Sequence, residues 1–278
     1  KVRLATILGT FQSTLVNFRY VSSMWKKNCE EERLLGVSLT GIMDSRITNG
    51  KSNKDLAKFL EKLKMESVEI NKEFAKEIGI NQSTSVTCVK PSGTVSQLVD
   101  AASGIHARHN PYYIRTVRGD KKDPLTKLMT EMGFPVEDDE MNPSHTAVFS
   151  FPMKVDRSAV FRTDLSAIEQ LDLWKVYQEH WCEHKPSVTI SVKESEWMEV
   201  GSWVYANFDQ MSGVSFLPFS EHTYRQAPYQ DCDREQYEKL LKEMPKDVDW
   251  SQLSKYEQVD TTVASQELAC TAGSCEIV

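Results

Sequence analysis

Short apolar segments without alternating polar residues recur along this chain, and helical segments lie between them. Such segments, rich in β-branched residues and bounded by Gly, Pro or polar residues, are typical of strands that are buried on both faces. We predict strands at residues 36–42, 84–89, 148–153, 187–192 and 213–217. Because a parallel pair of strands needs a long crossover connection, this order predicts a largely parallel α/β sheet or barrel.

Apolar residues at helical spacing predict the segments that connect these strands. The helices are expected at residues 2–32, 52–78, 95–101, 123–133, 167–183, 233–243 and 250–257. Two of them begin with capping signals, an Asp123-Pro124 start and a capping box from Ser166 to Glu169. After Phe219 the composition changes to charged helices and then to a tail of small residues that need not be folded.

The composition excludes several classes of protein. With 40% hydrophobic and 26% charged residues the chain is in the range of globular proteins, and a formal net charge of −7 argues against binding to nucleic acids or to membranes. It has no run of about 18 apolar residues and no signal peptide, so we expect a cytoplasmic protein. Six scattered cysteines do not suggest a secreted disulfide framework, which leaves reduced thiols or a catalytic pair. The chain begins without Met, within a helical pattern, and we expect it to be part of a longer protein.

A Pro-Ser-Gly-Thr turn at residues 91–94 separates the strand at 84–89 from the next helix. Unpaired amide groups and the helix dipole attract anions at such a helix start. Gly93 allows a phosphate to approach the backbone, and the neighbouring hydroxyl groups are further donors. The predicted phosphate-binding residues are Pro91, Ser92, Gly93, Thr94 and Ser96. An ordinary capped strand-to-helix turn has the same pattern and is the alternative interpretation.

Two cysteines, Cys270 and Cys275, lie near the end of the sequence and are separated by four small residues. A flexible spacer lets the two sulfur atoms meet and form a disulfide. A mobile tail can also move between a buried disulfide and an external reductant, as thiol–disulfide exchange requires. Two ligands are too few for zinc, which takes about four. We therefore predict a redox shuttle, with a disordered terminus that carries incidental cysteines as the alternative.

Residues 104–122 are the most basic stretch of this acidic chain. They suggest either an anionic ligand or an ordinary solvated face. The pattern His-x-x-His at 106–109 and the pattern His-x-Cys-x-His at 180–184 can each be written as metal ligands. Stabilisation of a helix C-terminus explains the second pattern equally well, so we predict no metal site.

Several common catalytic signatures are missing from the sequence. There is no Ser-His-Asp order, no Gly-x-Gly-x-x-Gly fingerprint and no Walker loop, which argues against the commonest hydrolases, dehydrogenases and nucleoside triphosphatases. A phosphate-binding turn combined with dithiol chemistry remains. The alternative functions are a non-catalytic nucleotide- or phosphate-binding module with spectator cysteines, and a structural zinc protein.

The segments around the turn are similar to the phosphate-loop region of the class II ribonucleotide reductases, which use adenosylcobalamin. The similar segments are residues 85–98 and 103–108, and three further segments, 36–42, 186–192 and 213–218, fit the same family in order and spacing. The terminal Cys-x4-Cys completes a resemblance that extends over nearly the whole chain. It is most like the ribonucleoside-triphosphate reductase branch of the family.

The resemblance implies the second half of a ten-stranded α/β barrel, the fold also seen in glycyl-radical enzymes. In this family a cysteine on a finger loop becomes a thiyl radical and abstracts the 3′-hydrogen of the ribose, and two further cysteines reduce the 2′-carbon and form a disulfide. The expected reaction converts ribonucleotides, here triphosphates, to 2′-deoxyribonucleotides. The expected regions are a partial barrel at 1–219, a helical C-terminal region at 220–262 and a flexible redox-active tail at 263–278.

The resemblance also assigns partners. The turn at 91–94 is expected to hold the substrate phosphates, and Cys270 with Cys275 to re-reduce the barrel disulfide before thioredoxin or a similar dithiol protein resets them. The cofactor is expected to be adenosylcobalamin, although no residue for it is identified. The Asn-x-Cys-x-Glu segment of the finger loop does not occur in this sequence. The chain is therefore expected to be inactive without an N-terminal portion of the same enzyme.

Overall fold

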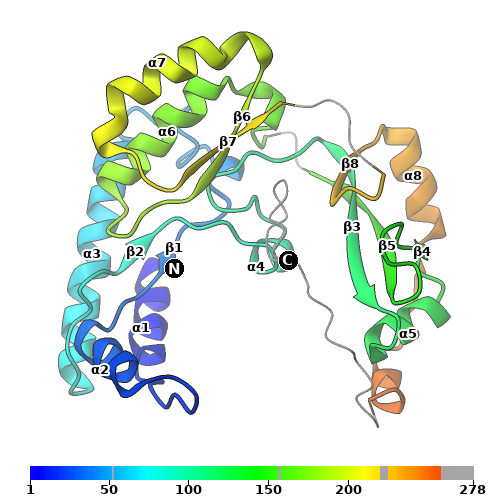
Figure 1. Cartoon of the computed structure of the whole chain (residues 1–278), viewed down its shortest axis with the longest axis horizontal. Coiled ribbons are helices and arrows are strands. Elements are labelled where there is room, and N and C mark those ends of the chain that lie inside the picture. The colour runs from blue at the N-terminus through cyan, green and yellow to red at the C-terminus, as the bar shows by residue number, and fades with distance from the viewer. Residues whose placement is uncertain (52, 156–157, 220–224, 258–278) are drawn as a thin grey trace. The chain divides into compact units, whose positions relative to one another are not determined.

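A computed structural model describes residues 1–51, 53–155, 158–219 and 225–257 of the chain (Figure 1). These residues divide into two compact units. Unit 1 contains residues 1–108 and 158–219, and unit 2 contains residues 109–157 and the described residues from 225 onward. Each unit has its own strands and its own hydrophobic cluster, so each folds around its own core.

Unit 1 is an α/β unit with two pairs of parallel strands. Its helices are α1 (Val2–Gln12), α2 (Ser23–Glu32), α3 (Leu56–Glu77), α4 (Val95–Leu98), α6 (Ala167–His180) and α7 (Trp197–Asn207). Its strands are β1 (Val37–Ser38), β2 (Thr87–Cys88), β6 (Val188–Val192) and β7 (Val214–Pro218). Strand β1 pairs with β2, and β6 pairs with β7. A helix connects the two strands of each pair, α3 in the first and α7 in the second, as parallel pairing requires.

The core of unit 1 forms where α6 packs on α3 and β6. Tyr177 and Trp181, in and just after α6, are fully buried. The indole Nε1 of Trp181 donates to the Cys88 carbonyl at 2.7 Å, and a Glu183 carboxylate oxygen accepts from the Val86 amide at 2.8 Å. These bonds join the end of α6 to β2. Because β2 leads directly into the Pro-Ser-Gly-Thr turn, they fix where that turn begins.

Unit 2 is an antiparallel sheet with two helices. Its strands are β3 (Tyr112–Asp120), β4 (Val136–Asp138), β5 (Thr146–Lys154) and β8 (Tyr229–Asp231), in the order β4-β5-β3-β8. Its helices are α5 (Pro124–Glu131), α8 (Arg234–Glu243) and the 3-10 helix η5 (Trp250–Lys255). Phe134, Ala147 and Phe149 form its buried cluster, and the Trp250 ring lies 6.1 Å from that of Phe134. Strand β8 joins the sheet beside β3, so residues after 224 fold with residues 109–157.

The five predicted strands are present with shifted bounds, β5 longer than predicted and β1 and β2 shorter, and the predicted parallel pairing is found in unit 1. The antiparallel sheet of unit 2 differs from the prediction of a largely parallel fold, since β3, β4 and β8 were not predicted. Helix α7 was also not predicted. Residues 109–157 group with the C-terminal region rather than with the rest of 1–219, because β8 pairs with β3. The described residues form no closed barrel.

The predicted helix at 2–32 is two helices, α1 and α2. The hydroxyl groups of Ser13 and Thr14 donate to the carbonyls of Thr10 and Phe11, both at 2.7 Å. Such bonds compete with the helical hydrogen bonds of the backbone and favour a helix end. Among the helices of the described ranges, none has the length and apolar character that a membrane crossing needs.

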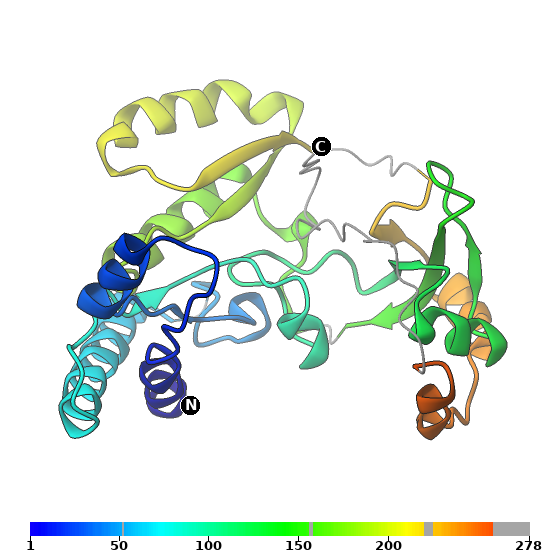
Figure 2. The same ribbon diagram turned by 60° about the horizontal axis from the view of Figure 1, so that its bottom comes forward.

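Helix α1 turns a polar face inward and an apolar face outward. It lies beside α3 (Figure 2), and the fully buried Thr10 hydroxyl accepts from the Asn71 side-chain amide at 2.9 Å. Leu4, Leu8 and Phe11 on the opposite face are each at least 60% exposed. Apolar side chains are usually covered in a folded protein, so this face of α1 is unusual for the surface of unit 1.

Candidate phosphate-binding site

The Pro-Ser-Gly-Thr turn follows β2 and precedes the short helix α4 in unit 1. The Ser92 amide donates to the Ser103 hydroxyl at 2.8 Å, and the Ser92 hydroxyl accepts from the Ser96 amide at 2.9 Å. The amides of Gly93 and Thr94 have no acceptor among the described residues. Unpaired amides at the start of a helix are the groups that bind anions.

The predicted site residues differ in their exposure. Pro91 and Thr94 are exposed, whereas Ser92 and Gly93 are half-buried. Ser96 is fully buried, and its hydroxyl donates to the Ser92 carbonyl at 2.5 Å. The structure therefore brings four of the predicted residues to the surface of the turn and places Ser96 beneath it.

The segment after α4, residues 100–108, returns beneath the turn and is held by the residues that follow β1. The Gly41 amide donates to the Ala102 carbonyl at 2.8 Å. The Thr40 hydroxyl donates to the same carbonyl at 2.9 Å and accepts from the Gly104 amide at 3.0 Å. Gly104 has φ of +55°, and a Cβ at this position would lie 2.7 Å from the Lys90 carbonyl oxygen. The return segment is thus packed closely against the residue that precedes Pro91.

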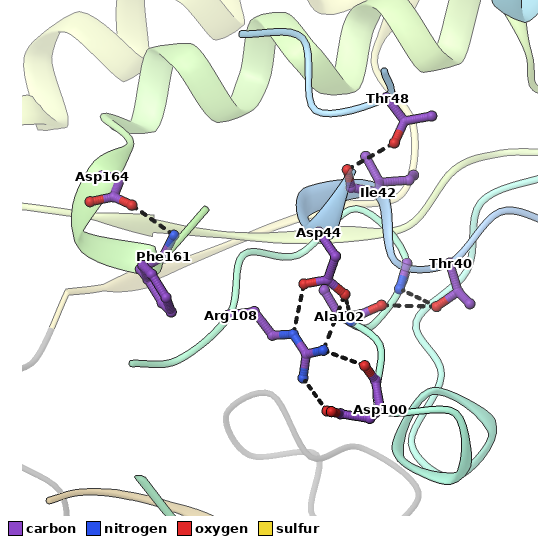
Figure 3. A network of polar contacts seen from close by, with 10 residues as sticks. Thr40, Ile42, Asp44, Thr48, Asp100, Ala102, Arg108, Phe161 and Asp164 are labelled. Carbon is purple, nitrogen blue, oxygen red and sulfur yellow. Dashed lines mark hydrogen bonds and ion pairs between the residues drawn. The ribbon is translucent and has the colours of Figure 1, made fainter. Parts of the chain in front are cut away.

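An ion pair between the buried Arg108 and the half-buried Asp44 contacts both ends of the return segment (Figure 3). The Arg108 Nε donates to Asp44 Oδ1 at 2.8 Å, and one Arg108 terminal nitrogen lies 3.2 Å from Asp44 Oδ2. The other terminal nitrogen donates to the Asp100 carboxylate at 3.2 Å. Asp44 Oδ2 also accepts from the Ala102 amide at 2.6 Å. Asp44 ends the 3-10 helix η1 (Ile42–Asp44), which follows β1.

His106 connects the return segment to β6. Its Nε2 accepts from the Thr189 amide at 3.0 Å, so the proton of the neutral ring is on Nδ1, which lies 3.1 Å from the Ser103 carbonyl. Burial of the ring lowers the pKa of His106 from its ordinary value of 6.5. Both ring nitrogens are therefore used in hydrogen bonds to the backbone. His180 instead pairs with Glu61 at 2.8 Å, and no group of three or more metal-ligating side chains occurs within the described residues.

The lowered pKa of His106 predicts a loss of stability in mild acid. The folded state binds fewer protons than the unfolded state near pH 6.5, so the contribution of His106 is complete above that pH and declines below it. A single proton gives a slope of at most about 1.4 kcal/mol per pH unit. Urea unfolding of the chain and of His106→Gln between about pH 8 and pH 5.5 measures this slope. Equal slopes for the two proteins would contradict the assignment.

Four cysteines lie within the described residues, and two of them are buried in unit 1. Burial raises the pKa of the Cys88 thiol and raises that of Cys182 to about 12. Burial, followed by the neighbouring Asp233 and Asp231, also raises the pKa of Cys232 in unit 2. Since the thiolate is the reactive form, these three are poor nucleophiles at neutral pH. The predicted redox residues Cys270 and Cys275 lie outside the described residues.

The basic stretch at 104–122 includes the strand β3, and the arginines of this strand have partners within unit 2. The Arg115 guanidinium lies 4.4 Å from the centre of the Tyr229 ring. Arg118 Nε lies 2.9 Å from an Asp139 carboxylate oxygen. This arrangement supports a structural role for the stretch rather than a second anion site. Sequence reasoning did not identify Asp44 or the role of Arg108, whose only signal was its place at the end of the segment 103–108.

The comparisons with known proteins agree on one class. A solved structure titled as a B-12 dependent (class II) ribonucleotide reductase superposes with a TM-score of 0.76 and 24% identity, over 95% of this chain and 40% of that one. The fold is therefore an α/β fold of the class II ribonucleotide reductase kind. No family model matches the chain.

Sequence relatives identify the branch. The adenosylcobalamin-dependent ribonucleoside-triphosphate reductase of Euglena gracilis is 30% identical over 90% of this chain and 35% of its own length. The enzyme of the same name from Lactobacillus leichmannii is 27% identical over 89% of this chain and 37% of its own length. A probable enzyme of this kind from Dictyostelium discoideum is 31% identical over 76% of this chain. The chain is a homologue of part of these reductases, which confirms the resemblance, and it spans little more than a third of the length of the first two.

Proposed function

We propose that this chain is part of a class II ribonucleotide reductase and holds the phosphates of the ribonucleotide, a triphosphate by relation to its homologues. The whole protein then converts ribonucleotides to 2′-deoxyribonucleotides by thiyl-radical chemistry, and the parallel strand pairs of unit 1 belong to the second half of a ten-stranded barrel. One observation carries the proposal. The homology extends over nine tenths of the chain, and it includes a turn in which two amides, those of Gly93 and Thr94, have no acceptor within the described residues.

The chemistry of the turn suits phosphate. The amides of Gly93 and Thr94 donate to phosphate oxygens, and their positive partial charge is reinforced by the start of α4. The Ser92 hydroxyl already accepts from the Ser96 amide, so its own proton can be donated to the ligand. Thr94 is exposed and supplies a second hydroxyl. In this proposal Ser96 supports the turn from below and does not touch the phosphate.

The tail supplies reducing equivalents. Cys270 and Cys275 transfer two electrons and two protons to a disulfide elsewhere in the enzyme and become a disulfide themselves. Thioredoxin or a similar dithiol protein then reduces the disulfide between Cys270 and Cys275 and is oxidised in turn. The three cysteines with raised pKa values in the described residues are poor candidates for this task, which supports its assignment to the tail.

The names of the homologues imply adenosylcobalamin as the cofactor. A cavity of about 350 Å3 lies between α2 and the segment that connects α1 to it, and is lined by Leu15, Phe18, Trp25 and Arg33, among others. Drug-sized ligands occupy pockets of about 300–1,000 Å3, and a corrin with its nucleotide is larger than such a ligand. These residues therefore do not fit the whole cofactor, and no residue of this chain is assigned to it.

The remaining portion of the enzyme is the proposed macromolecular partner. The exposed apolar face of α1, formed by Leu4, Leu8 and Phe11, supports this proposal, because a large apolar surface marks a contact with further polypeptide. The formal net charge of −7 argues against nucleic acid or an anionic membrane as a partner. A non-catalytic phosphate-binding module is the alternative, and it predicts phosphate binding without any reductase activity in the complete protein.

Complementation tests the proposal. The chain is combined with the rest of the same reductase, adenosylcobalamin, a ribonucleoside triphosphate and a dithiol, and deoxynucleotide is measured. We expect product from the mixture and none from either part alone. Leu8→Ser should lower the yield, whereas Met141→Ser, at an exposed position in unit 2, should not. Phosphate binding by the chain with no product from the mixture would favour the binding module.

A further inference from the structure

We propose that Asp44 and Arg108 form a clamp that positions the phosphate-binding turn by fixing the return segment, residues 100–108, on which the turn rests. The ligand in this inference rests on the proposed function, whereas the clamp itself rests on the contacts in unit 1. Neither residue touches the turn directly, so both are positioning residues.

The geometry of the ion pair makes it suitable for this role. Arg108 is 7% exposed and faces Asp44 with two nearly parallel contacts, from Nε to Oδ1 and from a terminal nitrogen to Oδ2. A bidentate pair of this kind fixes the direction of the guanidinium as well as its distance. Buried ion pairs contribute little net stability compared with apolar residues of similar size. A geometric role therefore explains this pair better than a gain in stability.

The clamp contacts the left-handed residue at which the return segment begins. Asp100 has φ of +46°, in the left-handed region that a residue with a side chain rarely adopts. Arg108 donates to both the carbonyl and the carboxylate of Asp100, at 2.5 and 3.2 Å (Figure 3). On the other side of this residue, the Ala102 amide donates to Asp44. This residue follows the end of α4, where the Asp100 and Ala101 amides donate to the Gln97 and Ser96 carbonyls at 3.1 and 2.8 Å, and the clamp adds contacts on both sides of it.

The return segment, which begins at Asp100, contacts the turn and the residue before it at two points. The Ser103 hydroxyl accepts from the Ser92 amide, inside the turn. Gly104 lies against the Lys90 carbonyl, immediately before the turn. A displacement of residues 100–104 therefore moves Ser92 and its neighbours. The clamp, the return segment and the turn form one connected structure, although Asp44 and Arg108 are 64 positions apart in sequence.

Amide hydrogen exchange and binding of inorganic tripolyphosphate to the 278-residue chain test the clamp. Asp44→Asn is nearly isosteric and removes the carboxylate charge that Arg108 faces. We expect exchange in residues 100–104 to become at least about tenfold faster and the Kd for tripolyphosphate to rise at least about tenfold, as the loss of charged hydrogen bonds implies. Arg108→Lys keeps the charge but not the two-pronged geometry. It should therefore retain only part of the tripolyphosphate binding of the unaltered chain.

Two controls separate positioning from general loss of stability. Asp139→Asn removes the carboxylate of a comparable pair, with Arg118 in unit 2, and should leave both readouts for residues 91–104 unchanged. The double variant Asp44→Asn/Arg108→Met removes both charges but keeps a side-chain oxygen for the Ala102 amide. It should recover much of the melting temperature that Asp44→Asn loses, while tripolyphosphate binding stays weak.

The outcomes distinguish the clamp from the phosphate assignment. Unchanged exchange of residues 100–104 in Asp44→Asn overturns the clamp. Recovery of binding together with stability in the double variant also overturns it, because the pair then serves only the fold. If the unaltered chain fails to bind tripolyphosphate, the phosphate assignment of the turn fails, and exchange in Asp44→Asn still decides whether the clamp holds the return segment.

Discussion

Replacement of Gly104 by alanine is expected to remove measurable tripolyphosphate binding and to lower the free energy of unfolding by about 3 kcal/mol or more. Gly104 has φ of +55°, where a Cβ costs about 1–2 kcal/mol by itself. That Cβ would also lie 2.7 Å from the Lys90 carbonyl oxygen and 3.6 Å from the Pro91 nitrogen. Both are backbone atoms, so the clash can be relieved only by moving the start of the phosphate-binding turn.

Gly79→Ala is the matched control for this prediction. Gly79 also has a positive φ, of +74°, but a Cβ there meets nothing within 4 Å. Gly79→Ala should lower the free energy of unfolding only by the cost of a left-handed alanine, about 1 kcal/mol, and should leave tripolyphosphate binding unchanged. Urea unfolding and calorimetric titration of the two variants measure the difference. Equal effects on stability, or unchanged binding in Gly104→Ala, would show that the contact with Lys90 is not what forms the turn.

The strand–turn–helix element around residues 91–94 was predictable because its pattern is local. An apolar strand, a Pro-Ser-Gly-Thr turn and a helix start lie within about fifteen consecutive residues, and the structure places β2 and α4 on either side of the turn. The residues that hold the turn were not predictable in the same way. Asp44 and Thr40 contact the return segment beneath the turn from a distant part of the chain, and single-sequence patterns contain no information about which distant polar side chains pair. The burial of Ser96 follows from the same long-range packing.

Unit 2 shows a second limit of sequence patterns. Strand β3 contains Arg115 and Arg118, which made residues 104–122 look like a solvated or ligand-binding stretch. In the structure these arginines are used inside the unit, one over the Tyr229 ring and one beside Asp139. The partners of these arginines come from other elements. The sequence of β3 alone therefore does not show which of its side chains are buried and which are exposed. The three-residue strand β8 is likewise too short to produce a signal of its own.

Helix α1 illustrates the difference between amphipathicity and burial. Its apolar stripe was correctly identified as helical, yet within the described residues this stripe faces outward and Thr6 and Thr10 face α3. Periodicity tells which residues share a face, and a partner must still be present to cover that face. The homologues are more than twice as long as this chain, and this difference in length agrees with a covering partner from the same enzyme.

Cys270→Ser and Cys275→Ser are each expected to lower thioredoxin-dependent turnover of the complete reductase by on the order of a hundredfold or more. A tethered dithiol acts at an effective concentration of about millimolar, far above that of a free reductase partner, and one serine prevents the disulfide that the tail must form. Turnover supported by a small dithiol such as dithiothreitol should be largely retained, because this reductant can reach the buried disulfide without the tail. Steady-state deoxynucleotide formation with each reductant measures the two rates.

Cys232→Ser is the control for the tail variants. Cys232 lies in unit 2, and burial together with its acidic neighbours raises the pKa of its thiol, so it should not take part in exchange at neutral pH. Its replacement should leave both rates unchanged. Full thioredoxin-dependent turnover in Cys270→Ser would remove the shuttle from the mechanism and return the terminal cysteines to the role of spectators. An equal loss with both reductants would instead indicate damage to the fold or to the substrate site, because a shuttle defect depends on the identity of the reductant and a folding defect does not.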